Sequence, residues 1–180
     1  MRARLLTLHR WLGLPASFVL AITGLTGAVL MVTAPSTVGK IAGHLHENMG
    51  LRLLGFGAAG ERLVAVITLA GVLLQLSGIV LWWKRRSLRV EFGGSLSRTI
   101  HDLHHAAGAV AFVMMLVISS AAAAYWFLPL GTGASMVNRL HHGRTYPAPV
   151  KVVYVLGSLG FTVQGCTGLL MWARRQRLLK

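Results

Sequence analysis

The sequence predicts an all-α membrane protein: a four-transmembrane-helix bundle built from two tandem two-helix repeats, with both termini in the cytoplasm. Of the 180 residues, 54% are hydrophobic and only 12% are charged, which is unlike the composition of a soluble domain. Four apolar runs are long enough to cross a bilayer core of roughly 30 Å, which requires about 20 helical residues. Short motifs also recur at matching places in the two halves of the chain.

The four apolar runs contain no Asp, Glu, Lys, Arg or His. They cover residues 11–33, 63–83, 106–128 and 152–173. What remains is too short for a separate soluble core, so we expect residues 1–180 to form a single transmembrane domain.

The basic residues predict the orientation of the helices. Twelve of the 18 lie before the first run, between the second and third runs, or after the fourth. Because loops rich in Lys and Arg stay in the cytoplasm, both termini are expected there. This asymmetry explains the net charge of +14 without a nucleic-acid partner.

Histidines mark the internal repeat. His9 and His104 each stand in the pattern L-H-x-x-x-G at the start of an apolar run. A second Leu-His pair follows 37 residues later in both halves, at His46 and His141. The pattern [ST]-G-x-x-x-W-x-[KR]-R closes each half. Such agreement predicts a tandem duplication of one two-helix unit.

The repeats cover residues 8–88 and 103–178. Because each unit crosses the membrane twice, the two should be related by an axis along the membrane normal. Equivalent histidines would then face each other across that axis, with one pair near each surface. We expect the linkers 35–46 and 129–141 to fold back as short interfacial helices that bring the second histidine to the axis.

Two facing histidines suit a heme iron, because the porphyrin supplies the other four ligands. A structural zinc site usually needs four ligands with Cys among them, and the only cysteine, Cys166, lies inside the fourth apolar run. We expect axial ligands at His9 and His104 on the cytoplasmic side. A second pair is expected at His46 and His141 on the opposite side. The alternates in the same clusters are His105, His142, His44 and His101.

Register with the first half selects His104 over His105. His9 and His104 both precede a glycine by four residues, Gly13 and Gly108, and residues i and i+4 share one face of a helix. Each imidazole should then lie above a residue without a side chain, which leaves clearance for a macrocycle.

Heme propionates favour cations at the membrane surface. Arg10 and Arg98 are candidates on the inner side, and Arg144 and Arg52 on the outer side. We identify one polar side chain within the spans, Gln164, and expect it to bond a neighbouring helix.

The segments LHRWLGL, SGIVLWWKRR, LHHGR and TGLLMWARR resemble the PepSY-associated transmembrane family, which includes bacterial inner-membrane iron–siderophore reductases. The resemblance spans residues 8–175. It implies a multi-pass inner-membrane protein that holds b-type heme between histidines and moves electrons across the membrane. His9, His104 and His141 match the family's Leu-His motifs best, whereas His46 is assigned from the repeat.

Family members commonly carry PepSY domains in a large external insertion between the first helices. Here the corresponding segment, residues 34–61, has only 28 residues. We therefore expect a minimal form without the periplasmic PepSY domain, serving a separate periplasmic partner.

We expect a diheme b-type cytochrome-like protein with two hemes b, acting as an electron-transfer subunit or a ferric-reductase-like oxidoreductase. Electrons would come from a quinol or cytoplasmic donor and reach ferric iron or a periplasmic redox protein. Besides the lipid membrane, partner subunits of a larger membrane complex are expected. One alternative is a divalent-metal binding or transport module that uses His44, His46, Glu47, His141 and His142. The other is a purely structural anchor subunit.

Overall fold

The chain folds almost entirely into helices. The structure, a computed structural model, describes residues 2–33, 36–84, 86–129, 131–176 and 178. In chain order, the elements are α1 (Arg2–Thr33), α2 (Thr37–Asn48), η1 (Leu51–Leu54), α3 (Gly57–Trp83), α4 (Leu96–Phe127), η2 (Gly131–Gly133), α5 (Ala134–His142) and α6 (Ala148–Arg175). No strand occurs within these ranges, which confirms the all-α fold class.

Four helices, α1, α3, α4 and α6, are long and apolar enough to cross a membrane. Two of them begin about ten residues before the apolar runs, because a helix can continue through polar residues once it leaves the lipid. At the start of α4, the Ser95 hydroxyl accepts a hydrogen bond from the Arg98 backbone N–H at 3.4 Å. This capping contact fixes the first turn outside the apolar run.

The short helices α2 and α5 confirm the prediction that each linker forms a helix. Ser36 caps α2 by accepting a hydrogen bond from the Gly39 backbone N–H at 3.0 Å. Gly143 ends α5 in the left-handed region with φ 66°, where glycine is favoured. Pro35, at the predicted start of the first linker, lies outside the described residues.

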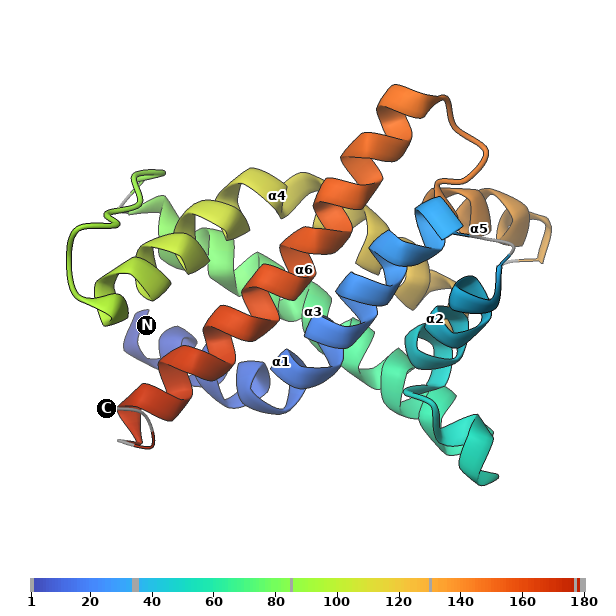
Figure 1. Ribbon diagram of the computed structural model, residues 1–180, viewed down its shortest axis with the longest axis horizontal. Helices are drawn as coiled ribbons and strands as arrows, with labels where there is room; N and C mark the ends of the chain where they lie inside the picture. The colour runs from blue at the N-terminus through green and yellow to red at the C-terminus, as the bar shows by residue number, and fades with distance from the viewer. Residues whose placement is uncertain (1, 34–35, 85, 130, 177, 179–180) are drawn as a thin grey trace.

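The packing order of the long helices agrees with a duplicated unit. Helix α1 packs against α3 and α6, and α4 packs against the same two helices. Exchanging the equivalent pairs, α1 with α4 and α3 with α6, leaves this order unchanged. Figure 1 shows both termini at one end of the bundle and α2 and α5 together at the other.

Small residues line the contacts between the long helices, whereas large apolar side chains face outward. A Cβ atom added at Gly24 on α1 would lie 2.6 Å from the Ser158 carbonyl oxygen on α6. One added at Gly160 would lie 2.6 Å from Cβ of Ala111 on α4. In contrast, Val110 is 75% exposed. Membrane helices typically pack this way, because lipid solvates the large apolar side chains.

Candidate functional site

The first histidine of each repeat bonds a hydroxyl on the second long helix of the same repeat. His9 Nδ1 on α1 lies 2.8 Å from Ser77 Oγ on α3. His104 Nδ1 on α4 lies 2.8 Å from Thr167 Oγ1 on α6. These pairs occupy equivalent places in the two repeats. His9 also lies near enough to His104 to interact with it electrostatically.

The glycine after each hydroxyl residue lies beside the imidazole. A Cβ atom added at Gly78 would lie 3.4 Å from His9 Cε1, and one added at Gly168 would lie 4.0 Å from His104 Cε1. The recurring [ST]-G pair therefore contributes the oxygen that contacts the imidazole. Spacing along the chain revealed the motif but not this contact, because the histidine belongs to another helix.

The clearance predicted above Gly13 and Gly108 is filled by neighbouring side chains. Leu74 Cδ2 would lie 3.7 Å from a Cβ atom at Gly13, and Gln164 Nε2 would lie 3.0 Å from one at Gly108. Gln164 also donates a hydrogen bond to the His104 carbonyl oxygen at 2.6 Å. These two glycines therefore serve helix packing, as does Gln164.

The second histidine of each repeat bonds a backbone carbonyl of the first long helix. His46 Nδ1 lies 2.9 Å from the Thr23 carbonyl oxygen, and His141 Nδ1 lies 3.1 Å from that of Ile118. Because a carbonyl oxygen only accepts hydrogen bonds, Nδ1 must carry the hydrogen in both rings. The Nε2 lone pair of each ring is therefore left available as a ligand.

The outer pair meets between the repeats. The ring centroids of His46 and His141 lie 5.9 Å apart with an interplanar angle of 37°. Imidazoles on opposite sides of one metal ion have centroids about 6 Å apart, since each metal–nitrogen bond is roughly 2 Å. The spacing and the free Nε2 atoms thus fit a bis-histidine heme iron.

Burial keeps the outer histidines neutral, as a metal ligand must be. It lowers the pKa of His46 from 6.5 to about 4, with nearby His141 as a second cause. Burial also lowers the pKa of His141. A Cβ atom added at Gly27 would lie 3.1 Å from His46 Cε1, so this ring packs tightly against α1.

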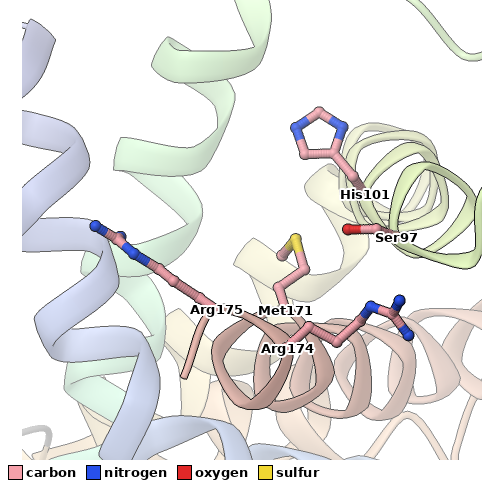
Figure 2. Close-up of a pocket in the computed structure, with 5 residues that line it drawn as sticks. All are labelled: Ser97, His101, Met171, Arg174 and Arg175. Carbon is pink, nitrogen blue, oxygen red and sulfur yellow. The ribbon is translucent and has the colours of Figure 1, made fainter. Parts of the chain in front are cut away.

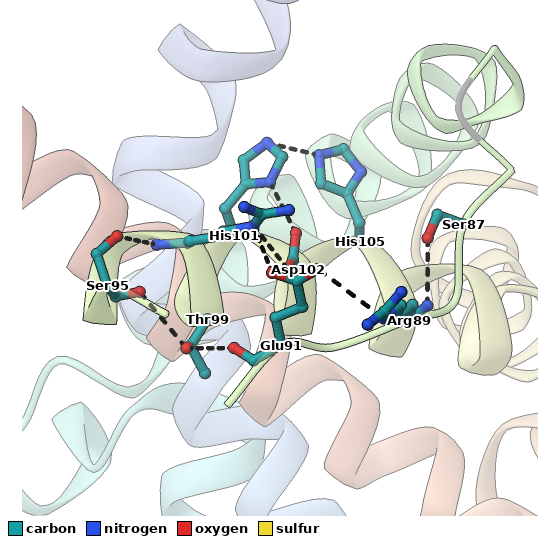
Figure 3. Close-up of polar contacts among 9 residues, drawn as sticks. Ser87, Arg89, Glu91, Ser95, Thr99, His101, Asp102 and His105 are labelled. Carbon is teal, nitrogen blue, oxygen red and sulfur yellow. Dashed lines mark hydrogen bonds and ion pairs between the residues drawn. The ribbon is translucent and has the colours of Figure 1, made fainter. Parts of the chain in front are cut away.

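The alternate histidines have other surroundings. His101 and His105 pair with each other on α4, with their Nε2 atoms 3.1 Å apart, and Figure 3 shows them beside the acidic side chain of Asp102. The ring of His142 contacts that of His141 edge to face, with the ring centroids 5.2 Å apart. His44 precedes His46 by two residues, so the two side chains leave α2 in directions about 200° apart, on nearly opposite faces of the helix.

Two of the four arginines considered for heme propionates pair with acidic side chains. Arg98 Nε lies 3.1 Å from Glu91 Oε2, and Arg52 forms an ion pair with Glu61. The other two, Arg10 and Arg144, are exposed. Arg144 lies close enough to His142 to help burial lower the pKa of that imidazole.

An open pocket of about 380 Å³ lies between α4 and α6 at the end of the bundle that carries the termini. Its lining residues are Ser97, His101, Met171, Arg174 and Arg175. Figure 2 shows Met171 pointing toward His101 and the two arginines pointing to opposite sides. His101 precedes His104 by three residues, so the pocket lies about one helical turn from that histidine.

A second polar side chain within the spans was not predicted from the sequence. Gln75 on α3 is 9% exposed, and its Nε2 donates to Ser119 Oγ on α4 at 3.0 Å. Its Oε1 is buried without a partner among the described residues. Gln75 has no polar counterpart in the second repeat, where Gly165 stands, so the repeat did not reveal it.

Within the described ranges, no three His, Cys, Asp or Glu side chains are placed to hold a metal ion together. A protein site for a divalent ion usually has three or more ligands. A bis-histidine heme needs only two.

The sequence model of a protein family, the "PepSY-associated TM region", matches residues 32–135, which is more than half of the chain. The chain belongs to this family. No curated protein and no solved structure matches it. Together with the four apolar helices, the match makes the chain a multi-pass membrane protein. The part matched to the PepSY-associated family includes His46 and His104, which is one histidine from each predicted pair.

Proposed function

We propose that this member of the PepSY-associated family is a b-type cytochrome-like protein of the bacterial inner membrane. Two hemes b would be held between His9 and His104 and between His46 and His141. The observation that carries the proposal is that all four imidazoles are oriented through Nδ1, in equivalent places of two repeats. Ligand histidines typically hold their second nitrogen in such a hydrogen bond.

A heme at each pair would supply an iron that alternates between the ferric and ferrous states. The protein's own contribution is to place the two pairs at different depths. On α1, His9 and Thr23, the residue that holds His46, are 14 residues apart, which corresponds to about 21 Å along the helix. His104 and Ile118 have the same separation on α4. Electrons would thus enter near the cytoplasmic face and leave near the periplasmic face.

The proposed donor is a quinol or a cytoplasmic reductant, and the proposed acceptor is ferric iron or a periplasmic redox protein. The exposed Arg10 and Arg144 are the proposed partners of the heme propionates, since neither takes part in the ion pairs described above. We also propose that the chain acts as one subunit of a larger membrane complex.

The test is an optical spectrum of the purified protein, produced with adequate heme supply and recorded before and after dithionite reduction. We expect low-spin b-type bands at two hemes per chain. His9→Ala and His104→Ala should each lose the same heme, and His46→Ala and His141→Ala the other. His44→Ala is the matched control and should keep both. A protein without heme bands would contradict the proposal and leave the divalent-metal and structural-anchor alternatives.

A further inference from the structure

The hydroxyl groups of Ser77 and Thr167 each lie within hydrogen-bonding distance of a backbone carbonyl oxygen as well as of an imidazole. Ser77 Oγ donates to the Leu74 carbonyl oxygen at 3.1 Å, and Thr167 Oγ1 donates to that of Val163 at 2.5 Å. Because a hydroxyl has only one hydrogen, a hydroxyl that donates to its carbonyl oxygen accepts from the nearby imidazole. In that arrangement, His9 and His104 carry their hydrogen on Nδ1.

This hydrogen placement is not the one that a free side chain prefers. In water, the neutral imidazole of histidine favours the Nε2–H form. A hydrogen bond at one ring nitrogen decides which tautomer is present. In this protein, the acceptor oxygen at Nδ1 leaves the lone pair on Nε2, the atom that points away from the helix backbone.

We propose that Ser77 and Thr167 are positioning residues that fix the ligand tautomer of His9 and His104. The glycine that follows each of them, Gly78 or Gly168, lies beside the ring. The inference rests on the proposed function, because the freed lone pair matters only if it binds iron. The inference also gives the Ser or Thr of the [ST]-G motif the same physical role in both repeats.

Three observations distinguish this role from ordinary packing. The same atom, Nδ1, meets the same kind of oxygen at 2.8 Å in both repeats. The residue type differs between the repeats, and only the hydroxyl is shared. The outer histidines reach the same tautomer through backbone carbonyls, so all four imidazoles present Nε2.

The first test needs no heme. Heme-free protein is labelled with ¹⁵N-histidine, and its ring nitrogen shifts are recorded by NMR, with signals assigned by single His→Ala variants. Wild-type His9 and His104 should be in the Nδ1–H form. Ser77→Ala should move His9 toward the Nε2–H form, and Ser77→Thr should restore it. Thr167→Val and Thr167→Ser should act in the same way on His104.

Thr68→Val is the matched control. Its hydroxyl lies on α3 like that of Ser77 and donates to a backbone carbonyl, that of Val64, at 2.8 Å. This variant should leave both tautomers unchanged. Finding His9 and His104 as Nε2–H in the wild-type protein would overturn the inference, even if no variant folds. Unchanged tautomers in folded Ser77→Ala and Thr167→Val would also overturn it.

A second measurement uses protein loaded with heme. Loss of the Nδ1 acceptor lowers the basicity of the ligand and typically weakens metal binding about 10–100-fold. Ser77→Ala should therefore raise the midpoint potential of the inner heme and speed its loss, while the outer heme stays unchanged. A protein that binds no heme, yet shows the expected tautomers, would refute the proposed function and leave the positioning role intact.

Discussion

At the scale of single residues, the four predicted ligands share one design: a buried or half-buried imidazole held at Nδ1 by an oxygen of its own repeat. The equal spacing of the Leu-His pairs predicted which histidines are equivalent. It could not predict the partner oxygens, because Ser77 and Thr167 lie on other helices and the rotation of one helix against another is not encoded in spacing. The same reason explains why the side chains beside Gly13 and Gly108, Leu74 and Gln164, were not predicted.

The contact between Gly27 and His46 gives a prediction for the outer pair. Gly27→Leu should displace the imidazole, because even a Cβ atom there would lie 3.1 Å from His46 Cε1. The rest of the leucine side chain would extend further into the ring, so we expect loss of the outer heme with retention of the inner one, measured by heme content and redox titration. Gly27→Ala is the control and should keep both hemes, since a shift of a few tenths of an ångström accommodates the Cβ atom alone and the second repeat has Ala122 at this position. Loss of the inner heme instead would contradict the assignment.

The lowered pKa of His46 predicts acid sensitivity of the heme-free protein. Its pKa is 6.5 in the unfolded chain and about 4 in the fold, so the unfolded state binds the proton more readily between these values. Stability should therefore be complete above pH 6.5 and fall by about 3 kcal/mol as the pH drops to 4. Thermal unfolding in detergent as a function of pH measures this loss. His46→Gln should show a clearly shallower pH dependence, and an unchanged slope would refute the prediction.

At the scale of elements, the helix types were predictable because the apolar runs and linker patterns are strong signals. The helix ends were not, since α1 and α4 extend well beyond the apolar residues that define a span. Gln75 shows a further limit: a polar residue without a counterpart in the other repeat carries no internal comparison. Its bond to Ser119 depends on how α3 packs against α4.

The close approach of α1 and α6 predicts a strong effect at Gly24. Gly24→Ala would place a Cβ atom 2.6 Å from the Ser158 carbonyl oxygen and 2.8 Å from the Thr162 backbone nitrogen. Backbone atoms cannot rotate away, so we expect a loss of about 1–3 kcal/mol in the free energy of unfolding. Unfolding in mixed micelles measures it.

Gly43→Ala is the matched control on α2, where nothing lies within 4 Å of an added Cβ atom. This variant should be neutral or stabilising by about 0.5–1 kcal/mol, because alanine favours a helix over glycine. Equal effects of the two substitutions would contradict the packing interpretation.

At the scale of the whole molecule, the basic residues predict the orientation in the membrane. Single cysteines at Ser87 and Gln176, in a Cys166→Ser background, should be labelled by an impermeant thiol reagent only after the cells are permeabilised. Cysteines at Lys40 and Asn138 should be labelled in spheroplasts without permeabilisation, because α2 and α5 lie at the other end of the bundle. Opposite accessibility of Ser87 and Gln176 would refute an even number of spans between them.

Every oxygen that holds a histidine belongs to the same repeat as that histidine. Each half of the chain therefore orients its own histidines, while the two halves pack against each other through α1 with α6 and α3 with α4. A two-helix peptide paired with a copy of itself would present the same four rings. This is the arrangement expected if gene duplication and fusion joined the subunits of a symmetric homodimer, after which each half was free to acquire residues, such as Gln75 and Gln164, that the other lacks.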